Sequence, residues 1–260
     1  MTLTLGRGPF GPESTTVFNF ERVGPAHALF WDDCPWRVRC ELAGETIADS
    51  RRVKMLHETG LPPVYYFPRA DVRFDLLRAT DRTTHCPYKG DASYWSIVLP
   101  DREVANAVWG YPSPIAGAPP IADYVAFYWG KLDRWLEEER ETHVHARDPY
   151  HHIAVMPSSR HVRVSVDGTL LAESRSPTVL FESGIRPRWY FRPEEVRLDL
   201  LQESSTRTRC PYKGRTTAYW SFGEHRDIAW CYGEPYASVG EIAGLVCFYD
   251  EKLQLDLAAD

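Results

Sequence analysis

The sequence contains no pair of cysteines spaced C-x-x-C, although it has six cysteines in 260 residues. Such pairs hold most structural zinc ions, so we expect no metal site. The N-terminal stretch lacks the basic start and apolar core of a signal peptide, and no apolar run approaches the roughly 20 residues that span a bilayer. These absences predict a cytoplasmic protein with reduced thiols and no membrane partner.

Positively charged residues are also fewer than negatively charged ones. Thirty Lys and Arg face 36 Asp and Glu, which gives a net charge of -6 at pH 7. Nucleic-acid-binding surfaces need clustered Lys and Arg to neutralise phosphates, so we do not expect nucleic acid as the main partner. A Gly-rich phosphate loop is missing as well, and we expect no cofactor. The oligomeric state stays open.

Residues that form turns and aromatic residues are abundant instead. Twenty prolines, seventeen glycines and an aromatic content of 13% favour short strands with frequent turns. A helix is predicted only over residues 131–137, where Leu132, Trp135 and Leu136 would share one face. The charged run 137–141 would form its solvated end.

One seven-residue motif occurs twice. Residues 84–90 are T-H-C-P-Y-K-G, and residues 208–214, 124 positions later, are T-R-C-P-Y-K-G. A Tyr-Trp pair follows each copy. Two predicted hairpins, centred on Ala43-Gly44 and Asp167-Gly168, lie at the same spacing. The register persists with few gaps over about 100 residues, which makes a chance resemblance implausible.

The repeat predicts a mainly β protein made of two tandem homologous small antiparallel β domains with little helix. Residues 1–33 have no evident counterpart and are interpreted as an N-terminal arm that packs across one module. The first β module is assigned to residues 34–142 and the second to residues 143–260.

The motif T-x-C-P-Y-K-G, its following Y-W, A-D-S-R at 48–51 and E-T-G-L-P-P-V-Y-Y-F-P at 58–68 together resemble the bacterial and fungal family catalogued as domain of unknown function 427. The resemblance covers residues 36–133 and 153–256 and looks like the tandem form of that family. It implies a fold similar to the β-tent class, which methionine-R-sulfoxide reductases share. Those relatives often carry zinc on two C-x-x-C pairs, which this sequence lacks. The family has also been labelled nucleotidyltransferase-like, a label that neither a phosphate loop nor a close acidic pair supports here.

The repeated turn places a thiol three residues from an ammonium, Cys86 with Lys89 and Cys210 with Lys213. A thiol in such a setting can act as a nucleophile. The alternative is that the cysteine packs under the turn while proline and glycine fix the backbone. The two lysines are candidates for contacting an anionic ligand.

Glu58 and Glu182 each lie two residues before a glycine and near aromatic residues. Desolvation there would raise the pKa of the carboxyl and suit a general acid or base, whereas an ion pair with Arg73 or Arg197 would give a purely structural role. Neighbours in a strand point to opposite faces, so one ring of each Tyr-Trp pair is expected to reach a ligand. The aromatic residues predicted to line the ligand site are Tyr65, Tyr94, Trp95, Trp189, Tyr219 and Trp220.

The leading hypothesis is that each module binds a small molecule, with anionic metabolites among the options, in a pocket at the Cys-Pro-Tyr-Lys-Gly turn. One alternative is an enzyme of unknown reaction that uses the glutamate as acid or base and the lysine as anion anchor. Another is a structural or protein-interaction module. The histidines between residues 143 and 152 are interpreted as a polar linker with one histidine reaching a module's cleft, in preference to a metal site.

Overall fold

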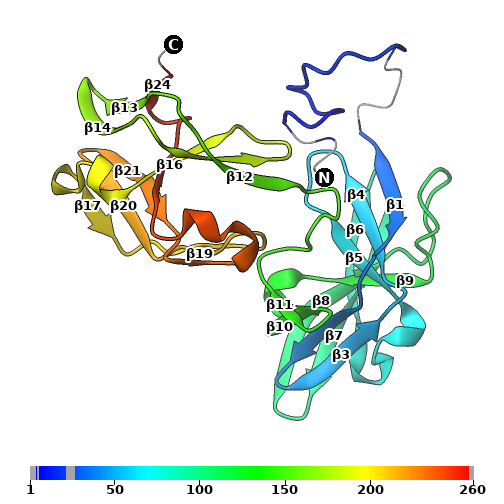
Figure 1. Ribbon diagram of the computed structural model, residues 1–260. Coiled ribbons are helices and arrows are strands. Elements are labelled where there is room, and N and C mark those ends of the chain that lie inside the picture. Colours follow the sequence, from blue (N-terminus) through cyan, green and yellow to red (C-terminus); the bar gives the residue numbers. More distant parts are fainter. Residues whose placement is uncertain (1–3, 5, 22–26, 258–260) are drawn as a thin grey trace. The chain divides into compact units, whose positions relative to one another are not determined.

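The computed structural model describes residues 4, 6–21 and 27–257. The chain divides into two compact units, one centred on residues 16–149 and one on residues from 150 onward (Figure 1). Both are built from antiparallel strands, as the sequence predicts. None of the helices in the described part of the chain has the length and apolar character of a membrane-spanning helix.

The first module contains a seven-stranded sheet and a four-stranded sheet. The large sheet has the strand order β1 (Leu29–Asp33), β4 (Lys54–Glu58), β5 (Val64–Pro68), β9 (Tyr124–Phe127), β8 (Arg102–Gly110), β7 (Gly90–Leu99) and β6 (Leu77–Cys86). The small sheet has the order β11 (Arg140–Thr142), β10 (Arg134–Glu137), β2 (Val38–Leu42) and β3 (Glu45–Ser50).

The second module repeats the strand order of the large sheet, but it has two three-stranded small sheets where the first module has one four-stranded sheet. Its large sheet has the order β12 (Ile153–Pro157), β15 (Thr178–Glu182), β16 (Arg188–Phe191), β23 (Val246–Phe248), β21 (His225–Cys231), β20 (Ala218–Phe222) and β17 (Gln202–Ser204). Its small sheets contain β14 (Thr169–Ser174), β13 (Val162–Val166) and β24 (Gln254–Leu257), and β18 (Arg209–Cys210), β19 (Gly214–Arg215) and β22 (Glu234–Pro235). Short 3-10 helices span Arg69–Asp71, Phe74–Leu76, Trp129–Lys131, Pro193–Glu195, Leu198–Leu200 and Ala237–Ile242.

Both predicted hairpins are confirmed. Strands β2 and β3 pair through a turn in which Ala43 and Gly44 have φ values of 52° and 82°. Strands β13 and β14 pair in the same way through Asp167 and Gly168, with φ values of 48° and 77°. Two consecutive residues with positive φ match the right-handed twist of the flanking strands, which explains why Asp-Gly is a reliable hairpin signal.

Each large sheet buries side chains on both faces. Alternate residues of β5 illustrate this, because Tyr65 and Phe67 belong to the main core between the sheets, while Tyr66 belongs to a second cluster on the opposite face. The second module has the same two clusters. We call the second cluster of each module the outer cluster, and the candidate site lies there.

The last residues of the predicted arm form part of the first module. Strand β1 pairs with β4 along its whole length, as β12 pairs with β15 in the second module. Of the earlier residues, the segment 6–15 groups with the second unit, where the Arg7 amide donates to the Gly184 carbonyl at 3.1 Å. The arm therefore ends before residue 29.

The predicted helix over residues 131–137 is wrong. A 3-10 turn ends at Lys131, and residues 134–137 form strand β10, which lies between β2 and β11. Trp135, Leu136 and Glu137 are all buried, so the local pattern fits neither a one-sided helix nor a one-sided strand. Tertiary pairing decided the outcome. Glu137 is correspondingly not solvated but bonded to the hydroxyl of Tyr65 at 2.7 Å.

One glycine ends each copy of the repeated Cys-Pro-Tyr-Lys-Gly turn, and its backbone conformation leads to a prediction. Gly90 and Gly214 have φ values of 99° and 102°, which L side chains rarely adopt. A Cβ at residue 90 would lie 3.2 Å from Ile115, whereas the nearest atom at residue 214 is 3.5 Å away. We expect Gly90→Ala and Gly214→Ala each to lower the free energy of unfolding by about 1–3 kcal/mol, with the larger loss at residue 90.

Urea unfolding measures both losses. Gly130→Ala is the matched control, since no atom lies within 4 Å of its added Cβ and its φ is not positive. A loss at residue 90 no larger than that of the control would contradict this account of the turn.

Candidate ligand site

A buried ion pair joins a strand end to the repeated turn in each module. Lys89 Nζ donates to Glu58 Oε2 at 2.6 Å, and the two side chains are only 9% and 11% exposed. Lys213 forms the same bond with Glu182, at 12% and 6% exposure. Each glutamate is the last residue of its strand, β4 or β15, and each lysine lies in the turn that follows β6 or β18. The fold thus brings together residues that are 31 positions apart.

The alternative of an arginine partner for these glutamates is wrong. The Arg73 guanidinium binds Asp75 at 2.6 Å, and Arg197 binds Asp199 at 2.8 Å. Both of those ion pairs are more than half exposed and lie within one local turn.

A histidine completes each ion pair. In the first module, His27 Nε2 lies 2.9 Å from Glu58 Oε1, and its ring stacks on Tyr88 with centroids 4.0 Å apart. In the second module, His151 lies 2.8 Å from the equivalent carboxylate and stacks on Tyr212 at 3.8 Å. The tyrosine of the Cys-Pro-Tyr-Lys-Gly turn therefore covers the histidine, while the lysine beside it holds the carboxylate.

Neither histidine was named as a site residue from the sequence, although one histidine of the linker was expected to reach a module's cleft. His27 fell within the predicted arm and His151 within the predicted linker. They are nevertheless 124 positions apart, the spacing of the repeated motif itself. Extending the repeat register towards the N-terminus would have found them. Of the other linker histidines, His145 Nδ1 bonds to the Ala146 carbonyl and His143 lies 3.7 Å from Glu141.

The surroundings hold both carboxylates in the charged form. Burial raises the pKa of Glu58 and of Glu182, but the bonds from lysine and histidine lower it by more. The net result is a pKa below the ordinary range for Glu58 and of about 2 for Glu182. The expected rise in pKa is therefore wrong in direction, because the sequence revealed the burial but not the counter-charges. A carboxylate with so low a pKa is a weak base and is not an acid at neutral pH.

A cavity of about 190 Å³ lies next to this ion pair in the second module. The cavity is smaller than the roughly 300–1,000 Å³ of pockets that enclose drug-sized ligands. Its lining combines charged groups with four tyrosines. The lining residues are Glu182, Ile185, Arg188, Tyr190, Thr208, Lys213, Tyr219, Trp230, Tyr232 and Tyr249.

The tyrosines of the cavity differ in how their hydroxyls are paired. The Tyr219 hydroxyl lies 2.8 Å from the hydroxyl of Thr208. The Tyr190 side chain is buried beside the indole of Trp230, whose N–H can only donate, so the proton of the Tyr190 hydroxyl has no acceptor among the described residues. Burial raises the pKa of Tyr190 well above its ordinary value, so this hydroxyl keeps its proton and remains a donor.

The predicted site residues separate onto the two faces of the sheets. Tyr94, Tyr219, Cys86 and Cys210 belong to or pack against the outer clusters, beside the ion pairs. Four aromatic residues lie on the opposite face instead, in or against the main cores, because strand neighbours alternate. These four are Tyr65, Trp95, Trp189 and Trp220.

The two outer clusters differ in how tightly they are filled. In the first module, Trp31 of β1 packs edge-on against Tyr66, with ring centroids 5.3 Å apart. The equivalent residue of β12 is Val155, whose side chain is much smaller. The indole of Trp31 thus fills space beside Tyr66, and the second module has no indole at the equivalent position beside Tyr190.

The low pKa of Glu182 generates a prediction about acid stability. A carboxyl whose pKa is lower in the folded than in the unfolded state stabilises the fold above the unfolded pKa and loses this effect as pH falls through the folded pKa. We therefore expect the free energy of unfolding to decline between about pH 4.5 and about pH 2. Glu182→Gln should flatten this decline, whereas Glu224→Gln at an exposed position should not. Denaturant titrations at several pH values measure the slope, and an unchanged slope in Glu182→Gln would argue against the ion pair.

Comparison with curated protein sequences gave no match. Two segments of the chain, residues 31–138 and 154–259, each match the family described as Domain of unknown function (DUF427). The segments correspond to the two modules defined by the repeated strand order and by the repeated ion pair. The chain is therefore a tandem member of the DUF427 family.

Proposed function

We propose that this protein binds a small anionic molecule in the cavity beside Glu182 and Lys213. The observation that carries the proposal is the buried hydroxyl of Tyr190, a residue that lines the cavity, because the proton of this hydroxyl has no acceptor among the described residues. A buried hydroxyl left unpaired costs about 1–3 kcal/mol. A ligand oxygen in the cavity would accept its hydrogen bond and remove that cost.

The charges around the cavity favour an anion. Lys213 and Arg188 both line it, and Glu182 is the one carboxylate among the described lining residues. Asp250 and Glu251 pair with Arg188 from outside the lining. An ammonium and a guanidinium carry several N–H donors each and have no acceptor, so they complement carboxylate or phosphate oxygens. In this proposal the ionised Glu182 holds Lys213 in place and does not transfer protons.

The cavity volume limits the size of the ligand. A space of about 190 Å³ suits a short-chain carboxylate or inorganic phosphate, and is too small to enclose a nucleoside triphosphate. This argues against nucleotidyl transfer at this site. The low pKa of Glu182 likewise weighs against the alternative of acid or base catalysis by that residue.

We place this activity in the cytoplasm as part of the same proposal. All six cysteines are free thiols, and Cys40 and Cys247 are fully buried in apolar surroundings. Secreted proteins commonly use such residues in disulfides, whereas cytoplasmic proteins keep them reduced.

Calorimetric titration with acetate, glycolate and inorganic phosphate, each against the neutral probe acetamide, tests the proposal. We expect at least one anion to bind and acetamide not to bind. Tyr190→Phe should weaken that binding about tenfold, because it deletes one hydrogen bond to a charged group, while the free energy of unfolding stays the same or rises. Tyr66→Phe, at the equivalent position of the first module, is the matched control and should leave binding unchanged.

Two outcomes would count against the proposal. One is that none of the three anions binds the wild-type chain. The other is that Tyr190→Phe binds the anion as tightly as wild type does, which would place the ligand elsewhere.

A further inference from the structure

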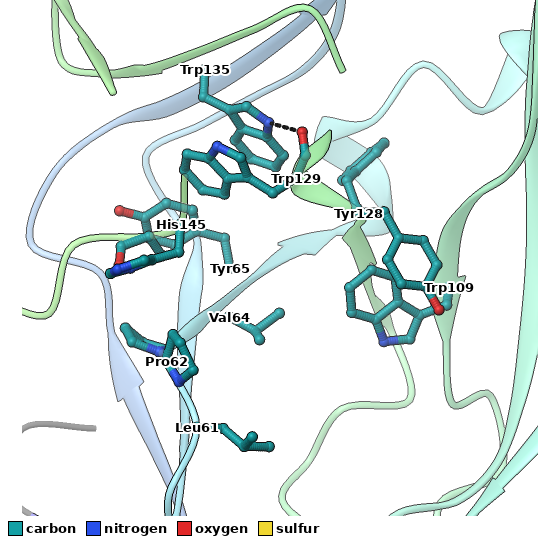
Figure 2. Close-up of a pocket in the computed structure, with 12 residues that line it drawn as sticks. Leu61, Pro62, Val64, Tyr65, Trp109, Tyr128, Trp129, Trp135 and His145 are labelled. Carbon is teal, nitrogen blue, oxygen red and sulfur yellow. Dashed lines mark hydrogen bonds between the residues drawn. The ribbon is translucent and has the colours of Figure 1, made fainter. Parts of the chain in front are cut away.

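A second cavity, of about 280 Å³, lies in the first module and has mainly aromatic walls (Figure 2). The indoles of Trp129 and Trp135 stack on each other, with centroids 4.3 Å apart and planes 7° apart. Figure 2 shows this indole pair on one side of the cavity and Trp109 with Tyr128 on the other, with Val64 between them. No part of the ion-pair site lines this cavity, so it is a separate feature of the module.

The second module shows what can occupy the space beside the Trp-Tyr pair. Its own pair, Trp230 and Tyr249, has ring centroids 4.3 Å apart, close to the 4.5 Å of the first module. The guanidinium of Arg188 lies 5.9 Å from the Trp230 ring centroid and 5.8 Å from that of Tyr249. Cations within about 6 Å of an aromatic ring are attracted by its negative face.

The residue equivalent to Arg188 in the first module is Val64, since Val64-Tyr65-Tyr66-Phe67 aligns with Arg188-Trp189-Tyr190-Phe191. The first module therefore keeps the aromatic pair but has no side-chain cation at this strand position. The cavity is found there instead. The second module thus places its own cation, the Arg188 guanidinium, against the Trp-Tyr pair, whereas in the first module a bound ligand could supply that cation.

The carboxylates that pair with Arg188 also have no counterpart in the first module. Arg188 binds Asp250 and, at 2.8 Å, Glu251. The residues aligned with these carboxylates in the first module are Trp129 and Gly130. No Asp or Glu is among the described residues that line the aromatic cavity. A cation bound there would be held by ring faces and not by a salt bridge.

This combination selects one class of cation. An ammonium or guanidinium with N–H groups would lose hydrogen bonds to water on entering a cavity without carboxylates. A quaternary ammonium has no N–H groups to satisfy and is recognised by aromatic walls. We propose that the first module binds a quaternary ammonium compound in this aromatic cavity.

The presence of Lys131 near Tyr128 is compatible with the binding of a second cation against the same tyrosine. Lys131 Nζ lies 5.2 Å from the Tyr128 ring centroid, and Lys252 lies 5.0 Å from that of Tyr249. In the second module the same tyrosine therefore accommodates both a lysine and Arg188.

Titration of the full chain with choline and with 3,3-dimethyl-1-butanol, its uncharged carbon analogue, tests the proposal. The two probes have nearly the same shape, so a difference in affinity reports the charge. We expect choline to bind at one site, and the neutral analogue to bind about tenfold more weakly or not at all. Equal affinities, or no binding of choline, would overturn the proposal.

Variants locate the site. Val64→Arg combined with Trp129→Asp installs the second module's cation and its anchor, and should abolish choline binding. Val17→Arg adds the same charge at a residue that is 92% exposed and should not change binding. Circular dichroism checks that each variant is folded. Choline binding that survives in a folded double variant would overturn the assignment.

A variant in the other module gives a test that does not depend on the stability of the first. Arg188→Val removes the internal cation and leaves its aromatic pair and carboxylates in place. We expect the stoichiometry of choline binding to rise from one to two. A stoichiometry that remains at one would contradict the argument from the internal cation.

Discussion

The structure of each module depends on one buried carboxylate–ammonium pair at the end of a strand. Removing one partner of such a pair leaves an uncompensated buried charge, at a cost of about 3–5 kcal/mol. The pair therefore fixes the repeated turn against β4 in one module and β15 in the other. The histidine that binds the carboxylate is held in turn by the tyrosine next to the lysine. Four side chains thus form one connected unit in each module.

The two copies keep this unit and differ around it. Arg188 in the second module lies against the Trp-Tyr pair and contributes charge to a small polar cavity. Val64 and Trp129 in the first module leave a larger aromatic cavity on that side. In the two proposals made above, a duplicated fold with one retained ion pair carries two sites of opposite preference, one for an anion and one for an organic cation.

Local patterns in the sequence predicted the hairpins and the mainly β class, because each depends on residues close together in the chain, and matching the two halves of the sequence at a spacing of 124 positions predicted the repeat. Glu58 and Lys89 were both selected from the sequence, but their pairing was not, since the contact spans 31 positions. The predicted rise in the pKa of Glu182 was wrong for the same reason, because the lysine that lowers this pKa is distant in the sequence. The helix over residues 131–137 failed because β10 is buried on adjacent positions, Trp135 and Leu136, by tertiary contacts that no periodicity encodes.

A double-mutant cycle on Glu182 and Lys213 tests the central claim most directly. It compares the free energies of unfolding of wild type, Glu182→Gln, Lys213→Met and the double variant. If the ion pair holds the turn in place, each single change is strongly destabilising, and the double change costs clearly less than the two single losses added together. Additive losses, with no coupling between the two residues, would contradict the account.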